Sequence, residues 1–358
     1  MGVYKDKKRD TWYVQVRYTD WKGERLQKVK RGFLTKKAAQ SWEREFLQSQ
    51  QADPSMTLDS FYKLYERDVK AKLKENTWLT KKSVYEDKIR PYFGKKKLNE
   101  ISASDNLAWH TTLLSAKMPN GKPYSQTYLR SIHAQLSAIL NHAVKFYGLR
   151  ENPAKKSGGM GSKDGDEMLF WTKEEYLKFS DVMMDNPLLY YAFEVLYWCG
   201  VREGELLALT RADFDLEART LRINKSYQRI HGKDVITTPK TKKSIRTIKI
   251  PDFLCDEMRD FFQQFYHLED DMRLFQMTKY KLLNAMETGS KKAGVKKIRI
   301  HDLRHSHISL LIDMGFSAVA IAERVGHESV EITYRYAHLF PTVQTEMADK
   351  LNMERRAS

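Results

Sequence analysis

In the stretch H-D-L-R-H, residues 301–305, His301 and Arg304 stand three positions apart. Residues with this spacing lie side by side on a helix, so both side chains can touch one ligand. Downstream, His327 follows a glycine in V-G-H, and Tyr336 comes nine residues later in T-Y-R-Y-A-H. The C-terminal part of the chain therefore offers basic groups and a phenol in a defined order.

Two further basic motifs lie upstream. C-G-V-R-E-G-E-L (199–206) contains Arg202, and T-P-K-T-K-K-S (238–244) contains Lys240. An apolar helix is predicted to break at Gly200, and such a junction can expose Arg202 in a cleft. One of these motifs alone would be a weak signal, whereas five in this order are specific.

The residue types suit chemistry on a phosphodiester. In-line displacement puts negative charge on the non-bridging oxygens, and fixed guanidinium groups can meet them with paired hydrogen bonds. Arg202 and Arg304 are the candidates. Glu205 either orients Arg202 or is only an acidic residue near a helix start, and the sequence leaves both interpretations open.

A nucleophile and an acid complete the reaction. A phenol has a pKa of about 10, so attack by Tyr336 requires a group that accepts its proton. Tyr334 is its competitor on the same segment. The departing 5′ oxygen needs a proton, which Lys240 can deliver, although Lys242 and Lys243 are rivals in the same turn.

No metal or nucleotide is expected, because a phosphotyrosine bond conserves the energy of the broken phosphodiester. The chain lacks a phosphate-binding G-x-x-x-x-G-K-[ST] loop and an acidic cluster suited to Mg²⁺. His305 and His307 lie near His301, but no cysteine or carboxylate pattern of a zinc site accompanies them.

These five motifs resemble those of the tyrosine recombinase family, of the phage-integrase type, across essentially the whole chain. The resemblance implies a site-specific DNA recombinase that works through a 3′-phosphotyrosine intermediate and integrates or excises a mobile element. It implies that His301 is the general base, that His327 donates a hydrogen bond to the phosphate, and that Glu205 fills the family's R-x-x-E position. The implied catalytic set is Arg202, Lys240, His301, Arg304, His327 and Tyr336, with Tyr336 as nucleophile.

Two other functions fit parts of the pattern. A type IB topoisomerase shares the chemistry, but it needs no separate N-terminal DNA-binding domain. A regulator that binds DNA without cutting it would not need all six side chains. A covalent DNA adduct would exclude the regulator.

Composition agrees with a DNA partner. The chain has 62 Lys and Arg against 46 Asp and Glu, a formal charge of +16 that suits a polyanion, although a ribosomal or membrane-surface protein would share it. No stretch of about 18 apolar residues is present, so no membrane span is expected. Two cysteines are too few for a disulfide framework, and a cytoplasmic location is predicted.

The predicted fold is multidomain and mainly helical with small β parts, and family resemblance suggests a C-shaped clamp on DNA. The expected order is an arm-type DNA-binding domain of a small sheet and a helix (1–52), a helical core-binding domain (56–152), a linker (153–168), a mostly helical α/β catalytic domain (169–341) and a tail helix (342–358).

Alternating and helical periodicity locate several elements. Residues 11–18 and 26–31 are expected to form a hairpin, followed by a helix over 35–47 that Thr35 caps. Further strands are expected at 219–225, 234–239 and 245–250.

The expected partners are double-stranded DNA, at core and arm-type sites, and three further copies of the chain in a tetramer on two DNA sites. Accessory directionality and DNA-bending proteins are possible. Val343, Met347 and Leu351 recur every four residues and predict an apolar stripe on the tail. In the family such a segment docks on a neighbouring subunit, and packing on its own domain is the alternative.

Overall fold

Two compact units, residues 1–166 and 167–358, make up the chain in the computed structural model. The structure describes residues 2–6, 9–19, 25–50, 55–162, 168–239, 241–334, 336, 353 and 355. The predicted fold class is confirmed within these residues, because helices predominate and the strands form small antiparallel sheets.

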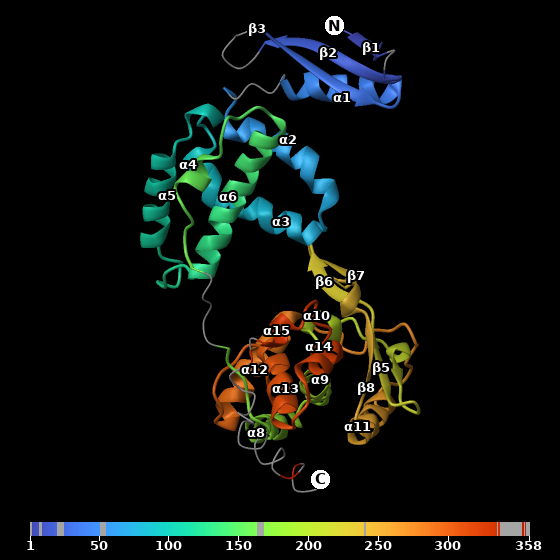
Figure 1. Ribbon diagram of the computed structural model, residues 1–358. Coiled ribbons are helices and arrows are strands. Elements are labelled where there is room, and N and C mark those ends of the chain that lie inside the picture. Colours follow the sequence, from blue (N-terminus) through green and yellow to red (C-terminus); the bar gives the residue numbers. More distant parts are fainter. Residues whose placement is uncertain are drawn as a thin grey trace. The chain divides into compact units, whose positions relative to one another are not determined.

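The first unit begins with an antiparallel sheet in the order β1-β2-β3. Its elements are β1 (Gly2–Asp6), β2 (Thr11–Thr19), β3 (Arg25–Phe33) and α1 (Lys36–Gln50). Strand alternation points Val14 and Val16 at α1, where both are fully buried, and Figure 1 shows α1 lying along one face of the sheet. The hairpin and the helix were predicted, and Thr35 accepts the N–H of Ala38 at 3.1 Å. Strand β1 was not predicted.

A helical body follows in the same unit. Its elements are α2 (Leu58–Val69), η1 (Lys70–Lys72), α3 (Glu75–Val84), η2 (Tyr85–Ile89), α4 (Arg90–Phe93), η3 (Leu98–Glu100), α5 (Ala103–Ser115), α6 (Gln126–Phe146) and α7 (Pro153–Lys156). Leu129, Ile132, Leu136, Ile139 and Leu140 recur at helical spacing on α6 and are almost completely buried. They form a core with Phe61 and Trp109.

Part of the stretch that was predicted as a linker, residues 153–168, has a defined structure. Pro153–Lys156 form α7, and Asn152 caps it by accepting the N–H of Ala154 at 2.9 Å. Ala154 and Met160 are buried in the helical core. The glycine-rich composition that predicted a linker therefore begins inside the folded body, and residues 163–167 lie outside the described part.

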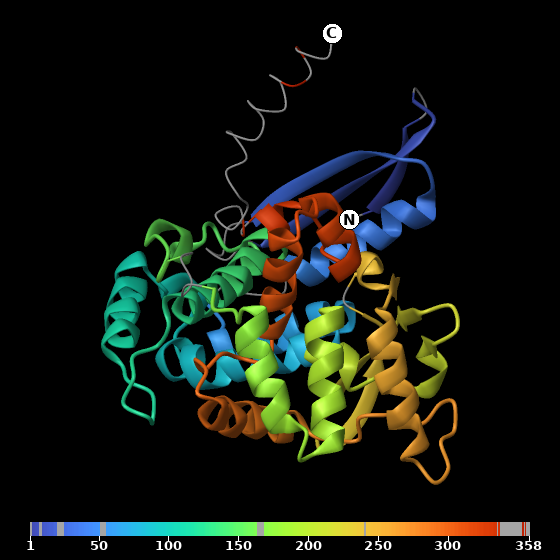
Figure 2. The same ribbon diagram turned by 90° about the horizontal axis from the view of Figure 1, so that it is seen from below.

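The second unit surrounds one apolar helix. Its helices are α8 (Lys173–Met183), α9 (Pro187–Cys199), α10 (Glu203–Leu206), η4 (Arg211–Asp213), η5 (Lys242–Ser244), α11 (Asp252–Gln263), α12 (Lys279–Ala293), α13 (Asp302–Asp313), α14 (Ala318–Val325) and α15 (Glu331–Tyr334). Helix α9 is apolar on most sides and packs against α8, α11 and α13; Figure 2 shows α8 and α9, in light green, side by side.

Strands cover another side of this unit. They are β4 (Phe214–Asp215), β5 (Thr220–Ile223), β6 (Ser226–Ile230), β7 (Lys233–Thr237) and β8 (Arg246–Lys249). One sheet has the order β4-β5-β8, and β6 pairs with β7 as a separate hairpin. Its turn residues His231 and Gly232 both have positive φ, as a tight two-residue turn requires. Strand β6 was not predicted.

Candidate active site

Arg202 lies where α9 ends. Gly200 closes α9 with φ of 60°, in the left-handed region, and a Cβ there would meet His307 at 2.5 Å. The chain then turns into α10, with Arg202 as the residue before its first turn. The Arg202 side chain is 35% exposed, so it is held from one side and open on the other.

Glu205 is the buried carboxylate of the site, and it contacts two arginines. Its Oε1 lies 2.7 Å from Nη1 of Arg202, and its Oε2 lies 3.0 Å from Nη2 of Arg246. Burial alone would raise the pKa of Glu205, but Arg246 and Arg202 outweigh burial and lower it. Glu205 therefore stays ionised and orients Arg202, as one of the two sequence interpretations held.

Arg304 approaches from α13 and is 2% exposed. Its Nη1 donates to the Gly200 carbonyl at 2.8 Å, and its Nη2 donates to the Val325 carbonyl at 2.5 Å. Burial and the charges of Arg202 and Arg246 lower its pKa, although a guanidinium stays protonated in proteins. Among the described residues its hydrogen bonds go to neutral carbonyls, so this buried positive charge favours the binding of an anion.

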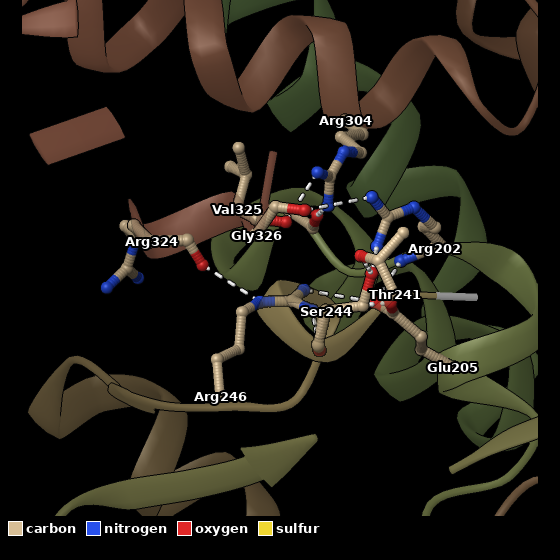
Figure 3. A network of polar contacts seen from close by, with 10 residues as sticks. Arg202, Glu205, Thr241, Ser244, Arg246, Arg304, Arg324, Val325 and Gly326 are labelled. Carbon is tan, nitrogen blue, oxygen red and sulfur yellow. Dashed lines mark hydrogen bonds and ion pairs between the residues drawn. The ribbon is translucent and has the colours of Figure 1, made fainter. Parts of the chain in front are cut away.

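The arginines converge on one turn of the chain. Arg202 Nη2 donates to the Gly326 carbonyl at 3.1 Å, next to the Val325 carbonyl that Arg304 holds. Figure 3 shows these guanidinium groups reaching the Val325–Gly326 backbone, with Arg246 on the Glu205 side. Arg202 and Arg246 thus share the Glu205 carboxylate, while the hydrogen bonds of the Arg304 guanidinium go to backbone carbonyls, so the site carries a net positive charge.

His327 follows the same turn. Gly326 has φ of 68° and ends α14, and a Cβ on it would meet the Lys243 carbonyl at 2.9 Å. The His327 Nδ1 lies 2.9 Å from the hydroxyl of the buried Thr333. Burial, Arg304 and Arg202 lower the pKa of His327 to about 3, so the ring is neutral. When the Thr333 hydroxyl donates to Nδ1, the hydrogen of the ring sits on Nε2 and can be donated to a ligand.

Tyr336 is 2% exposed and packs with Ile308, Ile312 and Val325. Its hydroxyl forms a short hydrogen bond with Nδ1 of His305. Because the Val325 carbonyl binds Arg304, the candidate nucleophile and the buried arginine meet the same residue.

His301 lies next to this pair. Its ring is 5.0 Å from the His305 ring, centroid to centroid, and nearly perpendicular to it. The residue is exposed, but the protein atoms around the ring and the charge of Arg304 lower its pKa. The structure thus brings His301 and Arg304 to the start of α13, where the His305 ring contacts the His301 ring and its Nδ1 contacts the Tyr336 phenol.

The expected general acid is not among the side chains that the structure describes. Lys240 and the side chain of Lys242 lie outside the described residues, as does the side chain of Tyr334. Lys243 is exposed, and its Nζ donates to the Glu328 carbonyl at 2.9 Å. No group of three or more potential metal ligands occurs among the residues that the structure describes.

Three residues of this region were not singled out from the sequence. Arg246 is 6% exposed and binds Glu205. Ser244 lies with its Oγ 3.5 Å from Arg202 Nη1. His305 was weighed only as a metal ligand. The I-R-T-I-K-I pattern at 245–250 contained a signal for Arg246, since alternation puts this arginine on the same side of the strand as the apolar Ile248 and Ile250.

Three known domain families match successive parts of the chain. Residues 170–342 match the phage integrase family, residues 3–50 match an arm DNA-binding domain, and residues 57–114 match the N-terminal SAM-like domain of phage integrases. Within the described residues no helix is both long and apolar enough to cross a membrane.

Relatives of the chain are integrases. The ICEBs1 integrase of Bacillus subtilis is 29% identical over 313 residues, which cover 83% of each chain. A putative prophage phiRv2 integrase of Mycobacterium tuberculosis is 25% identical over 289 residues, or 78% of this chain and 74% of the relative.

Solved structures share the fold. The Tn1549 transposon integrase in complex with circular intermediate DNA aligns with a TM-score of 0.69 and 21% identity, over 84% of this chain and 99% of that chain. A lambda integrase tetramer bound to a Holliday junction aligns with a TM-score of 0.60 and 17% identity, over 93% of this chain and 94% of that chain.

Proposed function

Since the chain belongs to the phage integrase family and is a site-specific tyrosine recombinase, we propose that it cleaves and rejoins double-stranded DNA through a 3′-phosphotyrosine at Tyr336. The exchange integrates or excises a mobile element. The observation that carries this residue assignment is the convergence of Arg202 and Arg304 on the turn beside the buried Tyr336.

The proposed chemistry uses each group in one role. Arg202 and Arg304 bind the non-bridging oxygens and stabilise the charge that grows on them during attack. His327 donates a hydrogen bond from Nε2 to the same phosphate. Glu205 touches no substrate and holds Arg202 in place.

Proton transfers accompany the exchange of bonds. The Tyr336 oxygen forms a bond to phosphorus while the bond to the 5′ oxygen breaks, and Lys240 gives that oxygen a proton. Family resemblance assigns the phenol proton to His301. Rejoining runs the same steps in reverse, so no external energy source is needed.

The DNA partners follow the domain order that the sequence suggested. Residues 1–52 would bind arm-type sites, and residues 56–152 with 169–341 would close on the core site as a C-shaped clamp. The tetramer of lambda integrase on a Holliday junction supports a tetramer here. Accessory directionality and DNA-bending proteins, and a cytoplasmic location, belong to the same proposal.

Replacing Tyr336 tests the proposal. Tyr336→Phe removes only the phenol oxygen, so the variant should bind DNA as tightly as the wild type but form no covalent complex. Nicked substrates that trap the adduct, made from the junctions of the encoding element and run on a denaturing gel, measure this. Tyr334→Phe is the control and should still form the adduct. An adduct that persists in Tyr336→Phe and disappears in Tyr334→Phe would move the nucleophile to Tyr334.

A further inference from the structure

We propose that His305, rather than His301, accepts the proton of the Tyr336 phenol, and that Asp302 positions His305 for this step. The inference rests on the proposed function and assigns one of its proton transfers. It makes His305 a catalytic residue and Asp302 a positioning residue.

The contact between His305 and Tyr336 is direct. The phenol hydroxyl hydrogen-bonds to Nδ1 of His305, and the two ring centroids are 5.6 Å apart. A general base must lie within hydrogen-bond reach of the proton that it removes, and His305 meets this condition in the structure. The His301 ring contacts the His305 ring, whereas the phenol forms its hydrogen bond with His305.

The opposite side of the His305 ring faces a fixed carboxylate. Asp302 is fully buried, and its Oδ1 lies 3.8 Å from Nε2 of His305. The carboxylate is itself held, because it accepts the backbone N–H of Arg299 at 2.8 Å and the Arg299 guanidinium at 2.8 Å. The three-residue spacing on α13 puts Asp302 and His305 on one face of the helix.

The proposed role requires one tautomer of the base. A neutral imidazole that accepts the phenol hydrogen at Nδ1 carries its own hydrogen on Nε2, on the side of Asp302. The order carboxylate, imidazole, hydroxyl nucleophile is that of serine hydrolases, but here the carboxylate acts on the imidazole by charge across 3.8 Å rather than by a hydrogen bond. After the transfer, the Asp302 carboxylate stabilises the imidazolium.

The electrostatic surroundings keep His305 ready to accept a proton. Burial and the neighbouring His301 lower the pKa of His305 to about 4, against the opposite effect of Asp302, so the ring is neutral at pH 7. The incoming phosphate brings negative charge close to the ring and raises its basicity. The phenol also becomes more acidic as its oxygen bonds to phosphorus, so the transfer accompanies bond formation.

The step is balanced. The phenol O–H bond breaks and its proton moves to Nδ1 of His305, while the Tyr336 oxygen bonds to phosphorus and the 5′ oxygen leaves with a proton from the general acid. On rejoining, the imidazolium returns its proton to the phenol oxygen as the phosphotyrosine bond breaks. No oxidant, metal or nucleotide takes part in this sequence.

Chemical rescue of a His305→Ala variant tests the inference, with His301→Ala as the matched control on the same helix. Adduct formation on nicked DNA is followed under single-turnover conditions, with and without added imidazole. His305→Ala should slow adduct formation on the order of a hundredfold or more, as expected for loss of a general base, and imidazole should restore part of the rate. His301→Ala should gain nothing from imidazole. Unimpaired cleavage by His305→Ala, or imidazole rescue of His301→Ala alone, would overturn the assignment.

Two further measurements guard against a folding defect and test Asp302. Gel shift on core-site DNA shows that His305→Ala still binds, and His305→Gln, which keeps a polar side chain without a base, should remain as slow. As a single substitution, Asp302→Asn should slow adduct formation. In the His305→Ala background it should cause no further decrease in the rate, because its effect passes through His305. A full additional loss there would make Asp302 a structural residue only.

These outcomes separate the inference from the function on which it rests. If the wild type forms no covalent adduct, the proposed function itself fails. If the wild type forms the adduct and His305→Ala forms it equally fast, only the His305 assignment fails.

Discussion

At the scale of single residues, Glu205 is the carboxylate that pairs with two arginines of the site. It is 2% exposed, and it neutralises Arg246, which would otherwise be an unpaired buried cation. Breaking a buried ion pair by removing one partner costs far more than losing a surface pair, because the remaining charge stays desolvated.

Glu205→Gln should therefore lower the free energy of unfolding by about 3 kcal/mol at pH 7. Glu203→Gln is the control, because Glu203 pairs with Lys279 at 3.1 Å where the lysine is 53% exposed, and such a pair contributes about 1 kcal/mol or less. Urea denaturation followed by circular dichroism compares the two. Equal losses would mean that Glu205 is not the electrostatic centre of the site.

The pH dependence of this loss has a definite sign. The pKa of Glu205 is lowered in the folded protein, so its contribution is present above its unfolded value and disappears as the pH falls through the folded value. The difference between Glu205→Gln and the wild type should therefore shrink on acidification below about pH 4.5.

Several of these residues could be predicted from the sequence, and others could not. His301 and Arg304 share one short motif, and helical spacing is enough to place them together. Arg246 could not be assigned to the site because its partner Glu205 is 41 residues away, and only folding brings the two together. His305 was visible in the motif, but the sequence does not say toward which side of α13 the phenol of Tyr336 packs.

At the scale of elements, periodicity located long helices better than short strands. The apolar helix that was expected to break at Gly200 is α9, and it ends at that glycine. Strand β6 was missed and β7 was expected to run to residue 239, since a two-stranded hairpin with mixed burial has little periodicity to read.

Contacts of Asp234 fix the β6–β7 hairpin a few residues before Lys240, the expected general acid. Asp234 of β7 accepts a hydrogen bond from the Tyr227 hydroxyl at 2.8 Å. It also forms an ion pair with Arg273 at 2.8 Å. Arg273 also lies 4.4 Å above the Tyr227 ring. Ser244, which contacts Arg202, lies only four residues after Lys240. The chain can therefore span at most roughly 14 Å between Lys240 and Ser244.

Lys240→Ala should slow cleavage of ordinary DNA on the order of a hundredfold or more, because the 5′ oxygen is a poor leaving group without a proton. A substrate with sulfur in place of that bridging oxygen needs no proton, and cleavage of it should recover. Lys243→Ala, whose native side chain is occupied with the Glu328 carbonyl, is the control and should cleave both substrates at similar rates. An equal defect of Lys240→Ala on both substrates would reduce Lys240 to a phosphate contact and leave Lys242 as the acid.

At the scale of the whole molecule, positive charge is concentrated at the N-terminus. Residues 1–50 contain 13 Lys and Arg against 6 Asp and Glu, an excess of seven. A fragment of residues 56–358 should therefore still form the covalent adduct on core-site DNA but lose arm-site binding. Its binding to DNA that carries both sites should depend less on salt, because fewer counterions are released. Loss of all cleavage in the fragment would make the N-terminal residues part of the catalytic fold.

The tail beyond Tyr336 carries the last prediction, and the stripe of Val343, Met347 and Leu351 lies outside the described residues. A helix of the predicted length is marginal by itself in water, so we expect its apolar stripe to pack against protein. Docking on a neighbouring subunit would connect each nucleophile to the next active site. Truncation after Leu339 should then weaken tetramer assembly on DNA, while binding of one subunit to a half-site stays nearly unchanged in a gel shift. Tetramers that form as before would mean that the tail packs on its own domain, and the contacts between subunits would have to come from other surfaces.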